Sequence, residues 1–212
     1  ICHPAQQVSE NAFSHLPDAA IRVVGILEAG GFEAWFVGGF VRDALLRRPC
    51  SDIDIASNAS WQQAQALFEA AGFKTHETGV AHGTLTVLVG NEAFEVTTYR
   101  RDGAYSDSRH PSSVEFVSSI EEDLARRDFT MNAIAFHPLR GLLDPYGGVG
   151  DLQAKTIRAV GDPTKRFSED ALRILRACRF AAQLGFDIED ETLFGMLSNK
   201  GIVYRVSAER VA

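Results

Sequence analysis

The alternation of strand-like and helix-like runs over the first two thirds of the chain restricts its fold more than any other feature. Asp18 to Ala29 places apolar residues on one helical stripe, and paired glycines end it. Phe32 to Val37 follows as an aromatic, β-branched strand. A helix over Gly39 to Arg47 and a half-buried strand over Ser51 to Ala56 repeat that order. The alternation predicts an α/β (α+β) domain built around one sheet.

The next segment adds antiparallel pairing to this pattern. Ser60 and Gln63 have the spacing of a capping box, which opens a helix that runs to Ala71. Thr84 to Val89 and Ala93 to Tyr99 are β-rich runs separated by three turn residues, which indicates a hairpin. We therefore expect a mixed sheet.

A polar segment and one more strand complete this region. Residues 100–113 are turn-prone and too many for a tight connection, and loops of this kind are usually mobile or functional. Ser119 and Glu122 have the spacing of a second capping box, and Ala133 to His137 is the last strand candidate.

The pattern after Pro138 is helical only. We expect helices over Leu152 to Val160, Ser168 to Leu184 and Asp190 to Ser198, with no further strand pair. The expected organisation is a mixed-sheet domain over residues 1–137 and an all-helical domain over residues 138–212.

Composition excludes several classes of protein. Hydrophobic residues make up 45% and charged residues 23% of the 212 residues, as in ordinary globular chains. No apolar run approaches the ~18 residues of a membrane span, and the first ten residues lack the order of a secretory signal. We therefore expect a cytoplasmic protein without a membrane partner. Three cysteines without a C-x-x-C pair argue against disulfides and a cysteine zinc site.

Charge is distributed unevenly. The formal net charge is -7, so a nucleic acid would have to bind where positive charge is local. Between Lys155 and Arg179 lie seven basic residues and three acidic ones. That run alone is more typical of a solvated helix face than of a binding site.

Two carboxylates stand two residues apart on a predicted strand. Because side chains alternate between the faces of a strand, Asp52 and Asp54 project together. Like charges repel unless a cation lies between them, and hard oxygen ligands suit Mg²⁺. Glu95 lies in the predicted hairpin. If its strand is a neighbour, Glu95 completes a three-carboxylate cluster that can hold two Mg²⁺ ions for phosphoryl or nucleotidyl transfer.

A glycine turn stands upstream of these acids. Gly38 and Gly39 separate a strand from a helix, so backbone N–H groups there can hold phosphate oxygens, and Arg42 adds charge one turn later. In the helical region, Asp170 and Arg173 are three residues apart, and one helix face would offer an acceptor and a donor together. Walker A and Gly-x-Gly-x-x-Gly patterns do not occur.

Four motifs in one order resemble those of class II tRNA nucleotidyltransferases. This family includes bacterial and eukaryotic CCA-adding enzymes, CC-adding and A-adding enzymes, and bacterial poly(A) polymerases. The motifs are Gly-Gly-Phe-Val-Arg-Asp at 38–43, Asp-Ile-Asp at 52–54, Arg-Arg-Asp-Phe-Thr-Met-Asn-Ala at 126–133 and Glu-Asp-Ala-Leu-Arg-Ile-Leu-Arg at 169–176.

The resemblance implies a polymerase-β-like nucleotidyltransferase head (residues 1–137) and a helical neck (residues 138–212). Family members usually continue into body and tail domains, so this chain is expected to be part of a longer protein. The implied activity is addition of CMP and AMP from CTP and ATP to the tRNA 3′ end, with release of pyrophosphate. Specialised A addition, CC addition, polyadenylation and a non-catalytic nucleotide-binding module remain alternatives. Ala171, where the poly(A) polymerases typically carry proline, favours CCA addition.

The resemblance also assigns a role to each candidate residue. Three carboxylates would be catalytic and would bind two Mg²⁺ ions, two glycines and an arginine would cradle the triphosphate, and two further residues would contact the ribose. A pair in the neck would select the base, and two arginines beyond it would hold triphosphate or the RNA end. The carboxylates are Asp52, Asp54 and Glu95, and the triphosphate residues are Gly38, Gly39 and Arg42. The ribose residues are Arg127 and Asp128, the base-selecting pair is Asp170 and Arg173, and the two arginines beyond that pair are Arg176 and Arg179.

Overall fold

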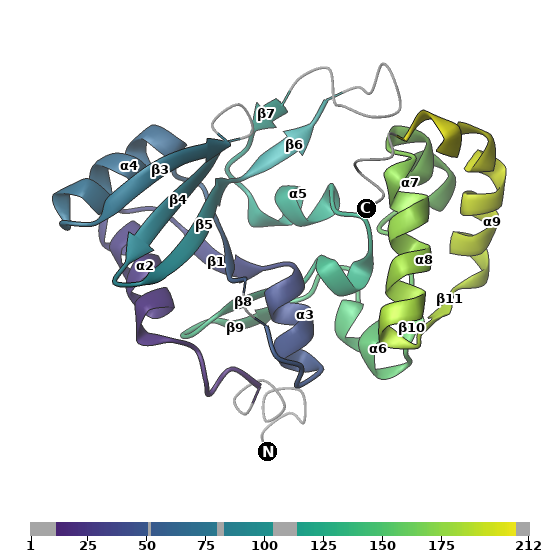
Figure 1. Cartoon of the computed structure of the whole chain (residues 1–212), viewed down its shortest axis with the longest axis horizontal. Coiled ribbons are helices and arrows are strands. Elements are labelled where there is room, and N and C mark those ends of the chain that lie inside the picture. Colours follow the sequence, from purple (N-terminus) through teal and green to yellow (C-terminus); the bar gives the residue numbers. More distant parts are fainter. Residues whose placement is uncertain (1–11, 51, 80–82, 104–113, 207–212) are drawn as a thin grey trace.

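One seven-stranded sheet organises the first part of the protein, which we call the α/β part (residues 12–143) (Figure 1). The computed structural model describes residues 12–50, 52–79, 83–103 and 114–206. The strand order is β3-β4-β5-β2-β1-β8-β9. The strands of this sheet are β1 (Ala34–Val37), β2 (Asp54–Ser57), β3 (Lys74–Gly79), β4 (Thr84–Val89), β5 (Glu92–Thr98), β8 (Ala135–His137) and β9 (Gly141–Leu143).

The sheet is mixed, as the sequence predicts. β2 and β5 are parallel, and the other neighbouring pairs are antiparallel. The predicted hairpin is β4–β5, and Gly90 adopts φ 63° in its turn, a conformation that favours glycine. The edge strand β3 was not predicted because its sequence, Lys-Thr-His-Glu-Thr-Gly, lacks alternating apolar residues. β9 extends the sheet beyond residue 137.

Two helices cover one face of the sheet. α2 (Asp18–Ala29) and α4 (Trp61–Ala70) contribute apolar side chains, among them Leu27 and Phe68, to the core that contains Phe36 of β1. The predicted capping box of α4 is present, since Ser60 Oγ accepts from the Gln63 N–H and Gln63 Oε1 accepts from the Ser60 N–H. This packing fixes which strand residues face away from α2 and α4.

A short helix packs on the other face of the sheet. Ile120 and Leu124 of α5 (Ile120–Ala125) belong to a second cluster with Trp35 of β1. The predicted capping box of α5 is wrong: Ser119 Oγ donates to Glu121 at 2.6 Å, and Glu122 pairs with Arg101 at 3.3 Å instead of folding back.

The predicted long loop begins and ends in a two-stranded ribbon. β6 (Arg100–Asp102) pairs with β7 (Val114–Phe116), a pairing that was not predicted. The intervening residues 104–113, on which the prediction of a mobile or functional loop falls, lie outside the described residues.

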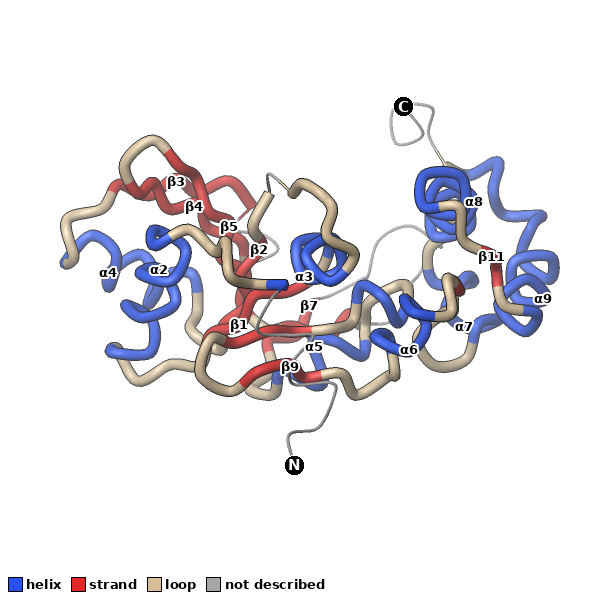
Figure 2. Tube along the Cα trace, turned by 90° about the horizontal axis from the view of Figure 1, so that it is seen from below, coloured by secondary structure: helices blue, strands red, loops and turns tan. Residues whose placement is uncertain are grey.

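The second part, which we call the helical part (residues 148–206), lies beside the α/β part (Figure 2). It is not all-helical, because β10 (Thr156–Ile157) pairs in parallel with β11 (Asp187–Ile188). The helix predicted over Leu152 to Val160 is also wrong, since α6 ends at Gln153 and Lys155 has φ 53°. The helices are α6 (Gly148–Gln153), α7 (Pro163–Glu169), α8 (Leu172–Leu184), α9 (Asp190–Asn199) and the 3-10 helix η3 (Lys200–Arg205).

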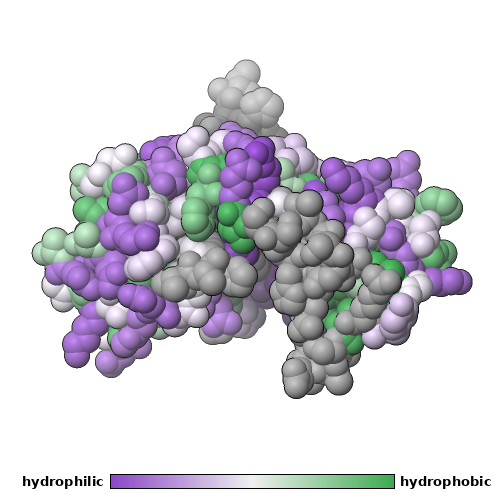
Figure 3. Space-filling model, turned by 90° about the horizontal axis from the view of Figure 1, so that it is seen from above, coloured by the Kyte–Doolittle hydropathy of each residue, from purple (hydrophilic) through white to green (hydrophobic). Residues whose placement is uncertain are grey.

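Exposed apolar side chains gather on α9. Leu193, Phe194 and Leu197 are exposed, and hydrophobic residues are visible at the edge of the molecule where α9 lies (Figure 3). None of the described helices combines the length and the apolar character that a membrane span requires.

Candidate functional site

The turn between β1 and α3 (Gly39–Leu45) has a backbone conformation at residue 38 that favours glycine. Gly38 adopts φ 71° and ψ -137°. A Cβ atom there would lie 3.0 Å from Arg127 Nη1 and 3.5 Å from Asp54 Oδ2. The positive φ favours glycine at this position, and a side chain would also crowd Arg127, although it would be at ordinary contact distance from Asp54.

The predicted neighbour of the acidic strand is confirmed. Asp54, the first residue of β2, is directly opposite Glu95 of β5, so both side chains project from the same face. Burial raises the pKa of Asp54, and the charges of Glu95 and Asp52 raise it further, whereas Arg127 opposes these effects. Negative charge is thus concentrated where the glycine turn meets the sheet.

The expected three-carboxylate cluster is only partly assembled. Asp52 precedes β2 instead of belonging to it, so strand alternation does not fix the direction of its side chain. In the described part of the chain, no three acidic, histidine or cysteine side chains already converge on one metal position. The oxygen donors of Asp54 and Glu95 are nevertheless of the type that Mg²⁺ prefers, and their mutual repulsion is what a cation would relieve.

Arg127 is held beside Asp54 by a buried aspartate. Asp123 is 1% exposed, and its Oδ2 accepts from Arg127 Nη2 at 3.0 Å. Asp123 also pairs with Arg126 at 2.9 Å. Burial opposes the ionisation of Asp123, but the two arginines outweigh it and lower the pKa of this carboxyl. Arg127 Nε is buried and has no hydrogen-bond partner within the described structure.

Asp128 links the two parts of the molecule. Its Oδ2 accepts from Arg176 Nε of α8 at 2.7 Å, and its Oδ1 accepts from Asn132 Nδ2 at 3.0 Å. Burial again opposes ionisation, yet Arg176 and these hydrogen bonds lower the pKa of Asp128. Asn132 Oδ1 in turn accepts from Arg42 Nη1 at 2.8 Å, so the α3 arginine belongs to the same network.

The prediction that Asp170 and Arg173 share one helix face is wrong. Asp170 lies between α7 and α8, with φ -142°, and its Oδ1 accepts from the Leu172 N–H. Arg173 is 8% exposed and pairs with Glu169 at 2.6 Å. It also donates to the carbonyl of Arg126 at the end of α5, which anchors the helical part to the α/β part.

A cavity of 570 Å³ brings most of the predicted residues together. Asp52, Glu95 and Arg179 are not among its lining residues; Arg179 is exposed on α8. Arg126 and Asn132 were missed although they stand in the 126–133 motif, whereas Arg100 gave no sequence signal. The lining residues are Gly38, Gly39, Arg42, Asp54, Arg100, Arg126, Arg127, Asp128, Asn132, Asp170, Leu172, Arg173 and Arg176.

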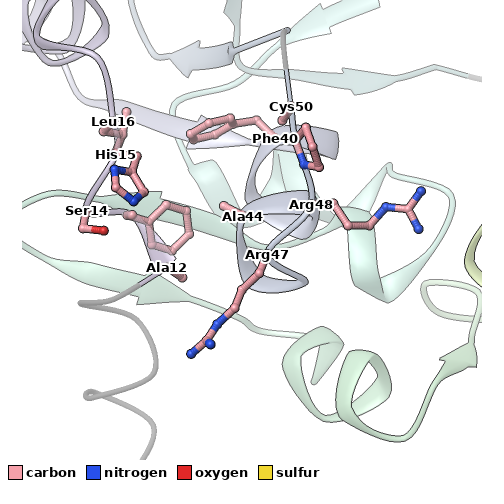
Figure 4. Close-up of a pocket in the computed structure, with 11 residues that line it drawn as sticks. Ala12, Ser14, His15, Leu16, Phe40, Ala44, Arg47, Arg48 and Cys50 are labelled. Atoms are coloured by element: carbon pink, nitrogen blue, oxygen red, sulfur yellow. The ribbon is translucent and has the colours of Figure 1, made fainter.

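A second cavity, of 640 Å³, lies between α3 and the segment Ala12–Leu16 (Figure 4). It has no acidic side chain among its lining residues. The guanidinium of Arg48 points away from Ser14 and His15 and reaches the carbonyl of Gln183 at 3.4 Å. This cavity therefore lacks the combination of carboxylates and arginines that lines the first one.

Similar proteins identify the family. A family model described as the poly A polymerase head domain matches residues 34–158. The CCA-adding enzyme of Streptococcus thermophilus is 48% identical over 200 residues, which are 93% of this chain and 49% of that protein. The crystal structure of the Bacillus stearothermophilus CCA-adding enzyme in complex with CTP has a TM-score of 0.83 and 42% identity, covering 94% of this chain and 46% of that one. A tRNA nucleotidyltransferase complexed with a primer tRNA and an incoming ATP analogue has a TM-score of 0.72 and 33% identity, covering 89% and 53%.

The fold and the cavity define an α/β domain that presents a glycine turn, a carboxylate and several arginines to one space. The matched family model spans more than half of the chain, so the chain belongs to the poly(A) polymerase head-domain family. The resemblance inferred from the four motifs is thereby confirmed. The chain spans about half the length of the curated relatives it matches.

Proposed function

We propose that the protein transfers CMP and AMP from CTP and ATP to the 3′ end of tRNA and releases pyrophosphate. The observation that carries this proposal is the 570 Å³ cavity, where the Gly38 turn, Asp54 and the arginines of three separate motifs meet. The names of the similar proteins, CCA-adding enzymes and a tRNA nucleotidyltransferase, support the same substrates.

The nucleotide would bind with its triphosphate on the glycine turn. Backbone N–H groups at Gly38 and Gly39 and the guanidinium of Arg42 supply donors for phosphate oxygens. Arg127 and Asp128 would contact the ribose, and the ion pair that Asp128 makes keeps its carboxylate charged as a hydrogen-bond acceptor. Arg176 adds a further cation on the α8 side of the cavity.

Asp52, Asp54 and Glu95 would hold two Mg²⁺ ions. Bound there, the ions would lower the pKa of the attacking tRNA 3′-hydroxyl and neutralise the leaving pyrophosphate. The carboxylates must be ionised for this. Burial and, less strongly, the charges of Glu95 and Asp52 raise the pKa of Asp54, so a bound cation would favour its ionised form.

The base would be selected in the helical part. Asp170 and Arg173 line the cavity from that side, and their acceptor and donor groups match the pairing edges of cytosine and adenine. Arg179 is exposed on α8 and does not line the cavity, so we propose that it contacts the RNA end and not the triphosphate. We propose residues 1–137 as the catalytic head and 138–212 as the nucleotide-selecting neck, except that β9 (Gly141–Leu143), which pairs with β8, belongs to the head.

The test is nucleotide incorporation by the intact protein. Transfer RNAs that end before C74, C75 or A76 are offered with labelled CTP and ATP. Sequential C, C and A addition is the expected result. Incorporation of A alone or C alone would indicate a specialised enzyme, and long A runs would indicate a poly(A) polymerase. Nucleotide binding without pyrophosphate release would refute the catalytic proposal.

Asp54→Ala should reduce incorporation by about a thousandfold, because a lost metal ligand removes several kcal/mol of charge stabilisation. Asp52→Ala should act in the same direction. The matched control is Asp187→Ala, which changes an exposed aspartate on β11 that does not line the cavity. Full activity in Asp54→Ala or Asp52→Ala would show that the metal assignment of that residue is wrong.

A further inference from the structure

Phe180 of α8 lies between two arginines of the cavity. The Cζ atom of Arg42, on α3, is 5.0 Å from the Phe180 ring centroid, and the Cζ atom of Arg176 is 5.3 Å from it. Arg176 and Phe180 are four residues apart on α8, so they are neighbours on the helix surface. One aromatic ring therefore contacts a cation from each part of the molecule.

These contacts close a ring of interactions across the junction. Arg42 donates to Asn132, Asn132 donates to Asp128, and Arg176 donates to Asp128. The hydrogen-bond distances are 2.8, 3.0 and 2.7 Å, respectively. Phe180 joins the two ends of this chain of polar contacts, and Arg42 also donates to both carboxylate oxygens of Asp43 at 2.9 Å.

The environment of Phe180 fixes the orientation of its ring. Phe129 meets it edge-on, with 5.8 Å between the centroids and an interplanar angle of 89°. Phe180 is half-buried and packs against the main core. The negative face of an aromatic ring attracts guanidinium groups, so the Phe180 ring adds a contact to arginines that also pair with Asp43 and Asp128.

We propose that Phe180 is a positioning residue that holds Arg42 and Arg176 at the spacing required for the nucleotide triphosphate. This inference rests on the proposed function, in which Arg42 binds phosphate oxygens, and it assigns Arg176 to the triphosphate as well. Because both arginines act on the triphosphate and not on the base, Phe180 affects CTP and ATP equally.

The experiment compares Phe180→Leu with Phe180→Trp in the intact protein. Phe180→Leu should raise the KM for CTP and for ATP by about tenfold each, since two cation–π contacts are lost, and leave kcat nearly unchanged. Phe180→Trp keeps an aromatic face and should restore KM to within about threefold of the original value. Phe194→Leu, which shortens an exposed aromatic side chain on α9, is the matched control and should change neither parameter.

A double-mutant cycle separates positioning from general packing. If Phe180 acts through the arginines, Phe180→Leu should raise KM much less in the Arg176→Leu variant than in the original protein. Additive effects, a change in kcat alone, or different factors for CTP and ATP would overturn the inference. Equilibrium binding of CTP to the unaltered protein distinguishes the two proposals. If the unaltered protein binds and transfers nucleotides while Phe180→Leu behaves identically, only the inference about Phe180 fails.

Discussion

Asp123 and Asp128 are two buried aspartates that hold arginines in different ways. Asp123, 1% exposed, pairs with Arg126 and Arg127, which directly follow its own helix α5. Asp128, 8% exposed, pairs with Arg176, which comes from α8 of the helical part. The first aspartate organises arginines within the α/β part, and the second joins the α/β part to the helical part.

The electrostatics of the two aspartates are otherwise alike. Burial alone would raise the pKa of both carboxyls, but neighbouring arginines and hydrogen bonds lower both values. The two aspartates differ in the exposure of their partner arginines. The Arg176 side chain is 40% exposed, whereas the Arg126 and Arg127 side chains are each 17% exposed. Similar charge pairs can therefore stabilise the α/β part at one position and join the α/β part to the helical part at the other.

Asp123→Asn should have the largest effect on folding. It leaves Arg126 and Arg127 without their counter-charge in a poorly hydrated position, which should lower the free energy of unfolding by about 3–5 kcal/mol. Urea denaturation at neutral pH measures this difference. A loss equal to that of Asp128→Asn would remove the distinction between the two aspartates.

Asp128→Asn should have a smaller effect on folding and a clear effect on nucleotide binding. The exposed side of Arg176 remains hydrated when its partner loses charge, so we expect a loss of about 1–2 kcal/mol in the free energy of unfolding. The KM for nucleotides should rise because asparagine has one acceptor oxygen where Asp128 has two, so Arg176 and Asn132 cannot both keep their hydrogen bonds. Denaturation and steady-state kinetics on the same preparation separate the two effects. An unchanged KM would contradict the role of Asp128 at the site.

Local patterns predicted much of the α/β part. Periodicity identified the sheet strands β1, β2, β4, β5 and β8, and the capping box of α4 needed only residues three apart. The strand β3 and the pair β10–β11 escaped prediction, because their pairing depends on neighbours distant in sequence and not on their own apolar pattern. The α5 capping box failed for the same reason, since Glu122 pairs with Arg101.

The sequence likewise predicted some features of the candidate site and not others. Motifs indicated that Gly38, Asp54 and Arg127 belong together, and the structure brings all three to one cavity. The partners of Arg173 could not be derived from spacing. Its contact with the Arg126 carbonyl joins residues 47 positions apart and exists only once α8 has packed against α5.

The smallest expected difference between Asp123 and Asp128 is in how the free energy of unfolding falls as the pH is lowered. Because both folded-state pKa values are lowered, the stability that these carboxylates contribute is present above the pKa of an unfolded aspartate, about 3.9, and is lost as the pH falls through the folded-state values. The free energy of unfolding should thus be insensitive to either group between pH 7 and about 5. Below about pH 4 the original protein should lose stability faster than Asp123→Asn, and the gap should be smaller for Asp128→Asn, whose partner is better hydrated. Urea titrations at several pH values test this, and parallel curves for the original protein and Asp123→Asn would contradict it.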